Sequence, residues 1–270
     1  MFLENLIGFL RITVEKPRNF GTFHVASLIL MTVAIVLVVV FGKKISDKTL
    51  KIILISIWAT LVLGEIYRQL DLGYKVDGGK WVYEYDWSQF PFQFCSSPLY
   101  VLPCVIFIKH GKTRQFFYDF LATFSLFAGL IVMFVPGNVF SESALINVQS
   151  MVHHGAMVVV AVLMYVTGKV KFSVFTVLRG AAVFGTLLVI ALILNATIIQ
   201  PKFNMFYINW RDTCRLPLLE DIQKLVPYPV FLMIYIVGFI ICAAIMHVVA
   251  FGFDCLRKLT LKSRKEQMNE

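Results

Sequence analysis

Long apolar stretches dominate the chain and are separated by short charged segments. Seven of them approach the roughly 20 residues that a helix needs to cross the hydrocarbon core of a bilayer. They cover residues 23–42, 50–70, 92–108, 116–135, 148–168, 174–199 and 230–253. The apolar runs are continuous and do not alternate, which excludes an outer-membrane β-barrel. The pattern predicts an all-α, polytopic membrane protein that forms a bundle of seven transmembrane helices.

The two ends of the chain differ from these stretches. Near the N-terminus, apolar residues recur at helical spacing between charged ones: Phe2, Leu3, Leu6, Ile7, Leu10 and Val14. This segment is either an amphipathic helix on the outer membrane interface or a short helix packed over the mouth of the bundle. The last residues are polar and basic, which favours a frayed tail. We therefore expect an interfacial N-terminal segment (1–20), a seven-helix transmembrane domain (21–256) and a basic cytoplasmic tail (257–270).

Basic and acidic residues separate onto alternate connections between the predicted helices. The basic connections contain Lys43, Lys44, Lys48, Lys51, Lys109, Lys112, Arg114, Lys169, Lys171, Arg257 and Lys258. The acidic connections contain Asp71, Asp77, Glu84, Asp86, Glu142, Asp212, Glu220 and Asp221. Because Lys and Arg concentrate on the cytoplasmic side, we expect the N-terminus outside and the C-terminus in the cytoplasm.

Composition agrees with a membrane protein. Of the 270 residues, 59% are hydrophobic and 15% charged, whereas a soluble domain has about 25% charged residues. The formal net charge of +9 follows mainly from the basic connections. A nucleic-acid partner would need an exposed basic face with interleaved aromatic residues, and the sequence has none. We expect membrane lipids as partners and leave the oligomeric state open.

Polar side chains within the apolar stretches gather at their predicted outer ends. They are Glu65, Arg68, Gln93, Cys95, Asn147, Ser150, His154, Asn195 and Gln200. Polar groups at membrane depth are costly, so each is a functional candidate. The inner halves of these helices are almost entirely apolar, which predicts one site facing the outer leaflet.

Helical spacing gives these residues directions. Asn147, Ser150 and His154 stand at i, i+3 and i+7 and share one face of a helix, whereas His153 points about 100° away. We expect His154 to face the bundle, either as a functional imidazole or as an interhelical hydrogen-bonding group. Glu65 and Arg68, at i and i+3, are best interpreted as an ion pair that neutralises itself.

The five cysteines offer one further candidate. Cys95, Cys104, Cys214, Cys242 and Cys255 lack any metal-ligand spacing, so we expect no metal site and no cofactor. Cys95 opens a predicted helix at the outer side, where the helix N-terminus would favour a thiolate nucleophile. Two other interpretations stay open: a small buried hydrophobe, or a disulfide with Cys214 in an outer loop.

Several short motifs in this order resemble the YwaF-like integral membrane family across roughly residues 20–255. They are PFQFC at 91–95, LYVLP at 99–103, HG at 154–155, LMY at 163–165, Asn195 and NMFYI at 204–208. The resemblance implies a bacterial seven-helix protein of the plasma membrane. It also implies a distant similarity to an animal transmembrane acyltransferase that moves fatty acyl chains onto lysophospholipids through a Cys and a His. On that basis Cys95 takes the thiol position, His154 the imidazole position, and Asn204 and Tyr207 join the site.

One position departs from the family pattern, which commonly reads Pro-Leu-His-Leu-Cys. Here Gln93 stands where that His would be. An amide cannot act as a base, so His154 would have to supply this function.

The leading hypothesis is a phospholipid acyltransferase in which Cys95 attacks an acyl ester and His154 takes the thiol proton. Gln93 or Asn195 would stabilise the oxyanion, and Asn147 or Ser150 would orient His154. The alternatives are a transporter or channel for a small solute, and a lipid-binding seven-helix protein without turnover. A solute pathway is disfavoured by the apolar inner half.

Overall fold

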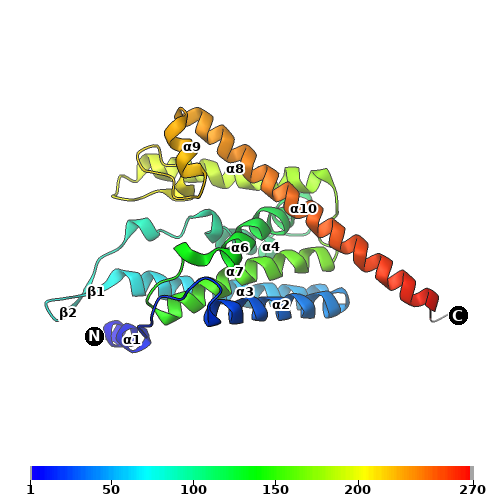
Figure 1. Cartoon of the computed structure of the whole chain (residues 1–270), viewed down its shortest axis with the longest axis horizontal. Coiled ribbons are helices and arrows are strands. Elements are labelled where there is room, and N and C mark those ends of the chain that lie inside the picture. Colours follow the sequence, from blue (N-terminus) through cyan, green and yellow to red (C-terminus); the bar gives the residue numbers. More distant parts are fainter. Residues whose placement is uncertain (1, 268–270) are drawn as a thin grey trace.

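The computed structural model describes residues 2–267, which form helices and one small hairpin (Figure 1). The α-helices are α1 (Phe2–Leu10), α2 (Thr22–Phe41), α3 (Asp47–Gly73), α4 (Pro98–Phe107), α5 (Lys112–Phe120), α6 (Leu126–Phe134), α7 (Ala144–Val166), α8 (Val174–Thr197), α9 (Leu219–Leu225) and α10 (Tyr228–Gln267). A π-helical turn, Leu121–Ser125, joins α5 to α6. Strands β1 (Tyr74–Asp77) and β2 (Lys80–Tyr83) pair antiparallel, with Tyr74 opposite Tyr83.

In the described part of the chain, six helical stretches are long and apolar enough to cross a membrane, so this is a multi-pass helical membrane protein. They are Thr22–Lys44, Asp47–Gly73, Lys112–Phe134, Ala144–Val166, Val174–Thr197 and Tyr228–Leu259. Each matches one of the seven predicted spans. The remaining predicted span, 92–108, is not a full-length helix.

Prolines explain the short third element. The segment begins with a 3-10 turn, η3 (Phe94–Ser96), and Pro98 then starts a helix of 10 residues that also contains Pro103. At 1.5 Å per residue α4 is about 15 Å long, half of what a bilayer core requires. Non-helical backbone at membrane depth is tolerated where protein surrounds it, and most side chains of α4 are buried.

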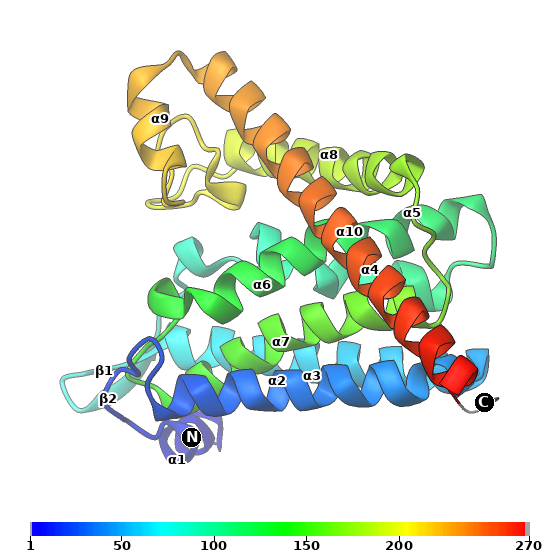
Figure 2. The ribbon, with the colours of Figure 1, turned by 45° about the vertical axis from the view of Figure 1, so that its right-hand side comes forward.

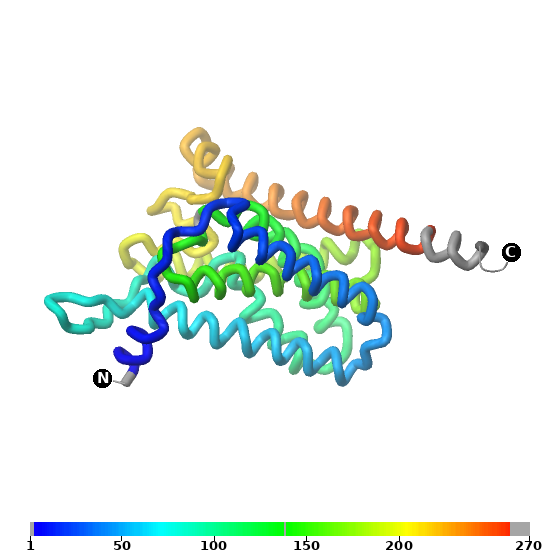
Figure 3. Tube along the Cα trace, turned by 60° about the horizontal axis from the view of Figure 1, so that its bottom comes forward, coloured from blue at the N-terminus to red at the C-terminus, as the bar shows by residue number. Residues whose placement is uncertain are grey.

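The central element of the bundle is α7, which packs against α2, α3, α6 and the π-turn. Helices α2, α3 and α7 run side by side, and α8 packs on α5 (Figures 1 and 2). The long α10 crosses the bundle obliquely (Figure 2), and its C-terminal part extends beyond the other helices (Figure 3). It is helical to Gln267, so the predicted frayed tail is not confirmed over 257–267. Residues 268–270 of that predicted tail lie outside the described residues.

The N-terminal segment is attached to one end of α3. The Arg11 side chain donates a hydrogen bond of 2.8 Å to a carboxylate oxygen of Asp71, and Thr13 forms an isolated bridge with Ser143. Ile7 is buried, whereas Phe9 is 81% exposed. The segment therefore packs over the bundle end and also presents an apolar side chain outward.

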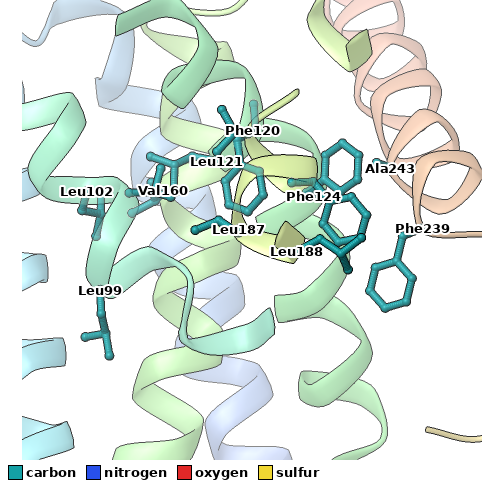
Figure 4. Packing of buried hydrophobic residues seen from close by; sticks show 14 of the residues in the cluster. Leu99, Leu102, Phe120, Leu121, Phe124, Val160, Leu187, Leu188, Phe239 and Ala243 are labelled. Carbon is teal, nitrogen blue, oxygen red and sulfur yellow. The ribbon is translucent and has the colours of Figure 1, made fainter. Parts of the chain in front are cut away.

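Aromatic side chains form the centre of the core. Phe120, Phe124, Phe184 and Phe239 stack with centroid separations of 5.8, 5.0 and 5.4 Å along the series. Figure 4 shows Phe120, Phe124 and Phe239 beside leucines of α8. These rings come from the α5 to π-turn region, from α8 and from α10, so they join three membrane-spanning segments.

A close approach of α6 and α7 depends on Gly129. A Cβ atom there would lie 2.8 Å from the backbone oxygen of His154 and 2.8 Å from Cβ of Met157. We expect Gly129→Ala to lower the free energy of unfolding by about 1–3 kcal/mol because the two helices would have to separate. Denaturant titration in mixed micelles measures this effect. The matched control is Gly185→Ala, where the added Cβ meets no atom within 4 Å and should be neutral or slightly stabilising. Equal effects of the two changes would contradict the packing argument.

Candidate active site

The Cys95 segment enters the bundle as the 3-10 turn η3. Phe94 is inserted into the aromatic core, with ring centroids 4.9 Å from Phe239 and 5.6 Å from Phe184. Cys95 is partly buried, and Ser97 is 2% exposed. The insertion of Phe94 fixes the backbone from which the thiol projects.

His153 lies directly against this segment. Its Nε2 is 2.9 Å from the backbone oxygen of Cys95. Because a carbonyl oxygen only accepts, Nε2 carries the proton and donates it. Nδ1 is then an unprotonated nitrogen, and it is buried without a hydrogen-bond partner among the described residues.

This geometry corrects the expectation that His153 points away from the bundle. The 100° separation between His153 and His154 holds, but α7 is surrounded by other elements, and both rings are buried. A helix in that position has more than one inward face. The all-round apolar composition of residues 156–166 is the sequence signal that indicates such a helix.

His154 carries its proton on the other ring nitrogen. Its Nδ1 donates to the backbone oxygen of Ser150 at 2.7 Å, and the Ser150 hydroxyl lies 3.5 Å from the same nitrogen. Nε2 is therefore the unprotonated nitrogen, and it too is buried without a partner in the described part of the chain. The rings of His153 and His154 are 5.3 Å apart. Two adjacent imidazoles thus each present a nitrogen that can accept a proton.

The Cys95 thiol is not hydrogen-bonded to the free nitrogen of either ring within residues 2–267. Phe94, the residue before Cys95, packs against Phe184, Phe206 and Phe239. The thiolate expected at the helix N-terminus stays a prediction.

Two further polar atoms beside Cys95 are buried and have no hydrogen-bond partner within residues 2–267. They are Oε1 of Gln93 and the hydroxyl of Ser97. Buried polar atoms in native proteins nearly always have a partner, so unpaired groups on elements that pack together mark a candidate binding site. With the imidazole nitrogens of His153 and His154, four such atoms belong to the Cys95 segment and the part of α7 that packs on it.

The amide side chains predicted for the site have mostly structural roles. Asn195 pairs with the backbone of Met205, donating at 2.9 Å and accepting at 2.8 Å. Asn204 binds backbone groups of Thr213 and Asn209 in the same way. These contacts use the oxygen and one hydrogen of each amide and hold the loop in place, and each amide keeps a second hydrogen.

Gln93 joins the same loop to the Cys95 segment. Its Nε2 donates to the backbone oxygen of Asn204 at 2.8 Å, which leaves the second amide hydrogen available. The structure therefore brings Gln93, Asn195 and Asn204 into one network. Asn147 is not part of it: its amide pairs with both backbone groups of Ser141 and shapes the turn before α7.

The loop contacted by Gln93 has a strained backbone. Phe206 and Tyr207 have φ values of 58° and 56°, in a backbone region that residues other than glycine rarely adopt. The Tyr235 hydroxyl donates to the Phe206 oxygen at 2.9 Å. Phe206 in turn packs against Phe92 and Phe94, with centroids 5.8 and 5.9 Å apart. Strain of this kind often accompanies functional sites, and here it shapes the loop beside Cys95.

Glu65 and Arg68 form the predicted ion pair at 3.0 Å. Arg68 also bonds Gln89, and Gln69 donates to Glu65 at 2.6 Å and to the backbone oxygen of Gln89 at 2.7 Å. The pair therefore attaches the connection that precedes Cys95 to the end of α3, a positioning role.

All five cysteines are free, so the alternative of a Cys95–Cys214 disulfide is wrong. A narrow apolar crevice adjoins the start of α4, between α3, the π-turn and α7. Its lining includes Leu61, Pro98, Leu121, Ser125 and Met157.

The fold and this cluster define a multi-pass helical membrane protein in which the Cys95 segment packs against two buried imidazoles of α7, His153 and His154. The chain belongs to the TMEM164 family, whose model matches residues 19–248. Comparisons with curated proteins and with solved structures give no significant match.

Proposed function

We propose that this protein is a membrane-embedded acyltransferase that acts on phospholipids and lysophospholipids through Cys95. The observation that carries the proposal is the group of unpaired polar atoms around the Cys95 segment: the free nitrogens of His153 and His154, the Ser97 hydroxyl and Oε1 of Gln93. A thiol, bases and hydrogen-bond donors in an apolar bundle are the components that acyl transfer needs. A lipid substrate suits their burial within the membrane.

The reaction proceeds in two steps, acylation of Cys95 and transfer of the acyl group to the acceptor. The Cys95 sulfur attacks the acyl carbonyl as an imidazole takes the thiol proton, and the imidazolium returns that proton to the departing lysophospholipid hydroxyl. A thioester remains on Cys95. A second lysophospholipid hydroxyl then attacks the thioester, its proton passes to the imidazole, and the thiol is restored when the imidazolium protonates the departing sulfur.

The residues around Cys95 have different roles in this reaction. His154 is the base, with Nε2 free, as the resemblance implies. His153 is a positioning residue, because its Nε2 proton holds the Cys95 carbonyl. Ser97 and the second amide hydrogen of Gln93 donate to the oxyanion, and Ser150 orients His154. The acyl chain extends along the apolar crevice at the start of α4, which must widen to admit it.

A lipid-binding protein without turnover would use the same pocket and would tolerate loss of the thiol. A transporter is supported less well. In the inner half, Asp119 and Arg179 form an ion pair with each other, and Gln115 donates a hydrogen bond to Asp119. These charges are therefore already paired and do not mark a solute path. We further propose that the protein lies in the bacterial plasma membrane, with the N-terminus and the Cys95 site toward the outside and the C-terminus in the cytoplasm.

The two histidines provide the test of these roles. Purified protein in liposomes should transfer a labelled acyl chain from a diacyl phospholipid to a lysophospholipid. His154→Ala should reduce the rate by about 10²–10⁴-fold because the base is lost. His153→Gln should retain activity better than His153→Ala, because the amide can still donate to the Cys95 carbonyl. A base would not be rescued by Gln. Full activity of His154→Ala, together with failure of Gln to rescue at position 153, would instead identify His153 as the base.

A further inference from the structure

A second site lies at the other end of α3 from the Glu65–Arg68 pair. There a cavity of about 430 Å³ opens between the start of α3, the α4–α5 connection and the segment after α7. Its charged lining consists of Asp47, Lys51, Lys109, Arg114 and Lys169. One wall is apolar, and the rest is dominated by cations.

The charges in this cavity do not cancel. Lys169 is paired with Asp47 at 2.6 Å, and Asp47 is the only acidic residue in the described lining. Lys51, whose ammonium lies 5.9 Å from the Phe107 ring centre, Lys109 and Arg114 form no ion pair with Asp47, although Arg114 lies within its electrostatic reach. The cavity therefore holds three uncompensated positive charges.

Arg114 is the residue that topology does not explain. Basic residues at this end are expected from the positive-inside rule, but such side chains normally extend into water. Arg114 is only 8% exposed, and its Nε is buried without a partner among the described residues. Its other contacts are neutral: Nη1 lies 3.2 Å from Nε2 of His110, and the guanidinium stacks 5.2 Å from the Tyr118 ring centre. A buried cation with an unpaired N–H raises the free energy of the folded state unless a ligand accepts a hydrogen bond from it.

We propose that this cavity binds a phosphate group. A guanidinium with free N–H donors and two ammonium groups match the oxygen atoms of a phosphate monoester or diester. The apolar wall formed by Leu50, Leu54 and Ile106 would accommodate hydrocarbon attached to it. Two sources share this chemistry: a phospholipid headgroup and a soluble phosphate ester. The site is separate from Cys95 and does not depend on acyl transfer.

The test uses the full chain purified in a neutral detergent. Binding of short-chain phosphatidic acid, short-chain phosphatidylcholine, glycerol 3-phosphate and inorganic phosphate is measured by native mass spectrometry and by ligand-dependent thermal shift. Arg114→Gln should weaken phosphate binding by at least about tenfold, since a charge-assisted contact is lost. Because that variant can disturb a buried position, the double variant Lys51→Gln/Lys109→Gln is tested beside it, as both lysines are exposed. It should show a loss of similar size.

Lys44→Gln is the matched control. Lys44 follows α2, is exposed and, unlike Lys51 on the same connection, does not line the cavity, so its removal should leave binding unchanged. Binding of the phospholipids alone identifies a headgroup site, and binding of glycerol 3-phosphate or inorganic phosphate identifies a soluble ester. The proposal is overturned if none of the four compounds binds, if the cavity variants bind normally, or if Lys44→Gln loses as much binding as they do.

Discussion

Cys95→Ala is expected to lower the rate of acyl transfer by at least about 10³-fold while the protein remains folded, because the covalent intermediate cannot form. The assay follows a labelled acyl chain between phospholipid and lysophospholipid in liposomes. A partly buried Cys next to a packed Phe94 is replaced by a smaller apolar residue, so the fold should persist. Removing His154 in addition should cause little further loss, since nucleophile and base act as a unit.

Cys104→Ala is the control for this change. Cys104 lies in α4, is partly buried and donates a weak hydrogen bond to the backbone oxygen of Tyr100 at 3.4 Å. Its removal should leave the rate close to that of the wild type. Undiminished transfer by Cys95→Ala would remove the nucleophile from the account, and absence of transfer in the wild type would favour the lipid-binding alternative.

Arg179→Ala is expected to lower the free energy of unfolding by about 3 kcal/mol. The Arg179 side chain pairs with Asp119, which is fully buried, and Gln115 donates to the same carboxylate at 2.8 Å. Removing Arg179 leaves a buried carboxylate with one amide donor. The effect lies at the lower end of the usual range because the Arg179 side chain is itself 30% exposed. Denaturant titration in mixed micelles measures it.

Two comparisons isolate the cause of that loss. The double variant Asp119→Leu/Arg179→Leu removes both charges and should recover much of the lost free energy. Lys224→Ala breaks the exposed pair of Lys224 and Glu220 and should leave stability unchanged, since such pairs contribute little. If the double variant is less stable than Arg179→Ala, the unpaired carboxylate is not the cause.

The membrane-spanning segments could be predicted because apolar length is a local property. Six of the seven predicted spans form long helices for this reason. The failure at 92–108 has a local cause as well: Pro98 and Pro103 lie within that run, and it becomes a turn followed by the half-length helix α4. In this segment the two prolines decide the helix length, whereas mean hydropathy does not.

The candidate site could be predicted only in part. Helical spacing gives the angle between His153 and His154 but does not show which elements surround α7. The contact of His153 with the Cys95 carbonyl therefore cannot be predicted from the sequence. Asn195, Asn204 and Gln93 lie in one network, but sequence cannot show that both asparagine amides bind loop backbone. The pairing of Asp119 with Arg179, 60 residues away in the chain, likewise depends on tertiary structure.

The most direct test of the central claim is the intact mass of the protein after incubation with an acyl donor. A phospholipid with a defined acyl chain is supplied without acceptor, and the protein is analysed before and after treatment with hydroxylamine, which cleaves thioesters. The account predicts a mass increase equal to one acyl group, carried by the peptide that contains Cys95, removed by hydroxylamine and absent from Cys95→Ala. An unmodified wild-type mass under conditions in which acyl transfer occurs, or the same adduct on Cys95→Ala, would contradict it.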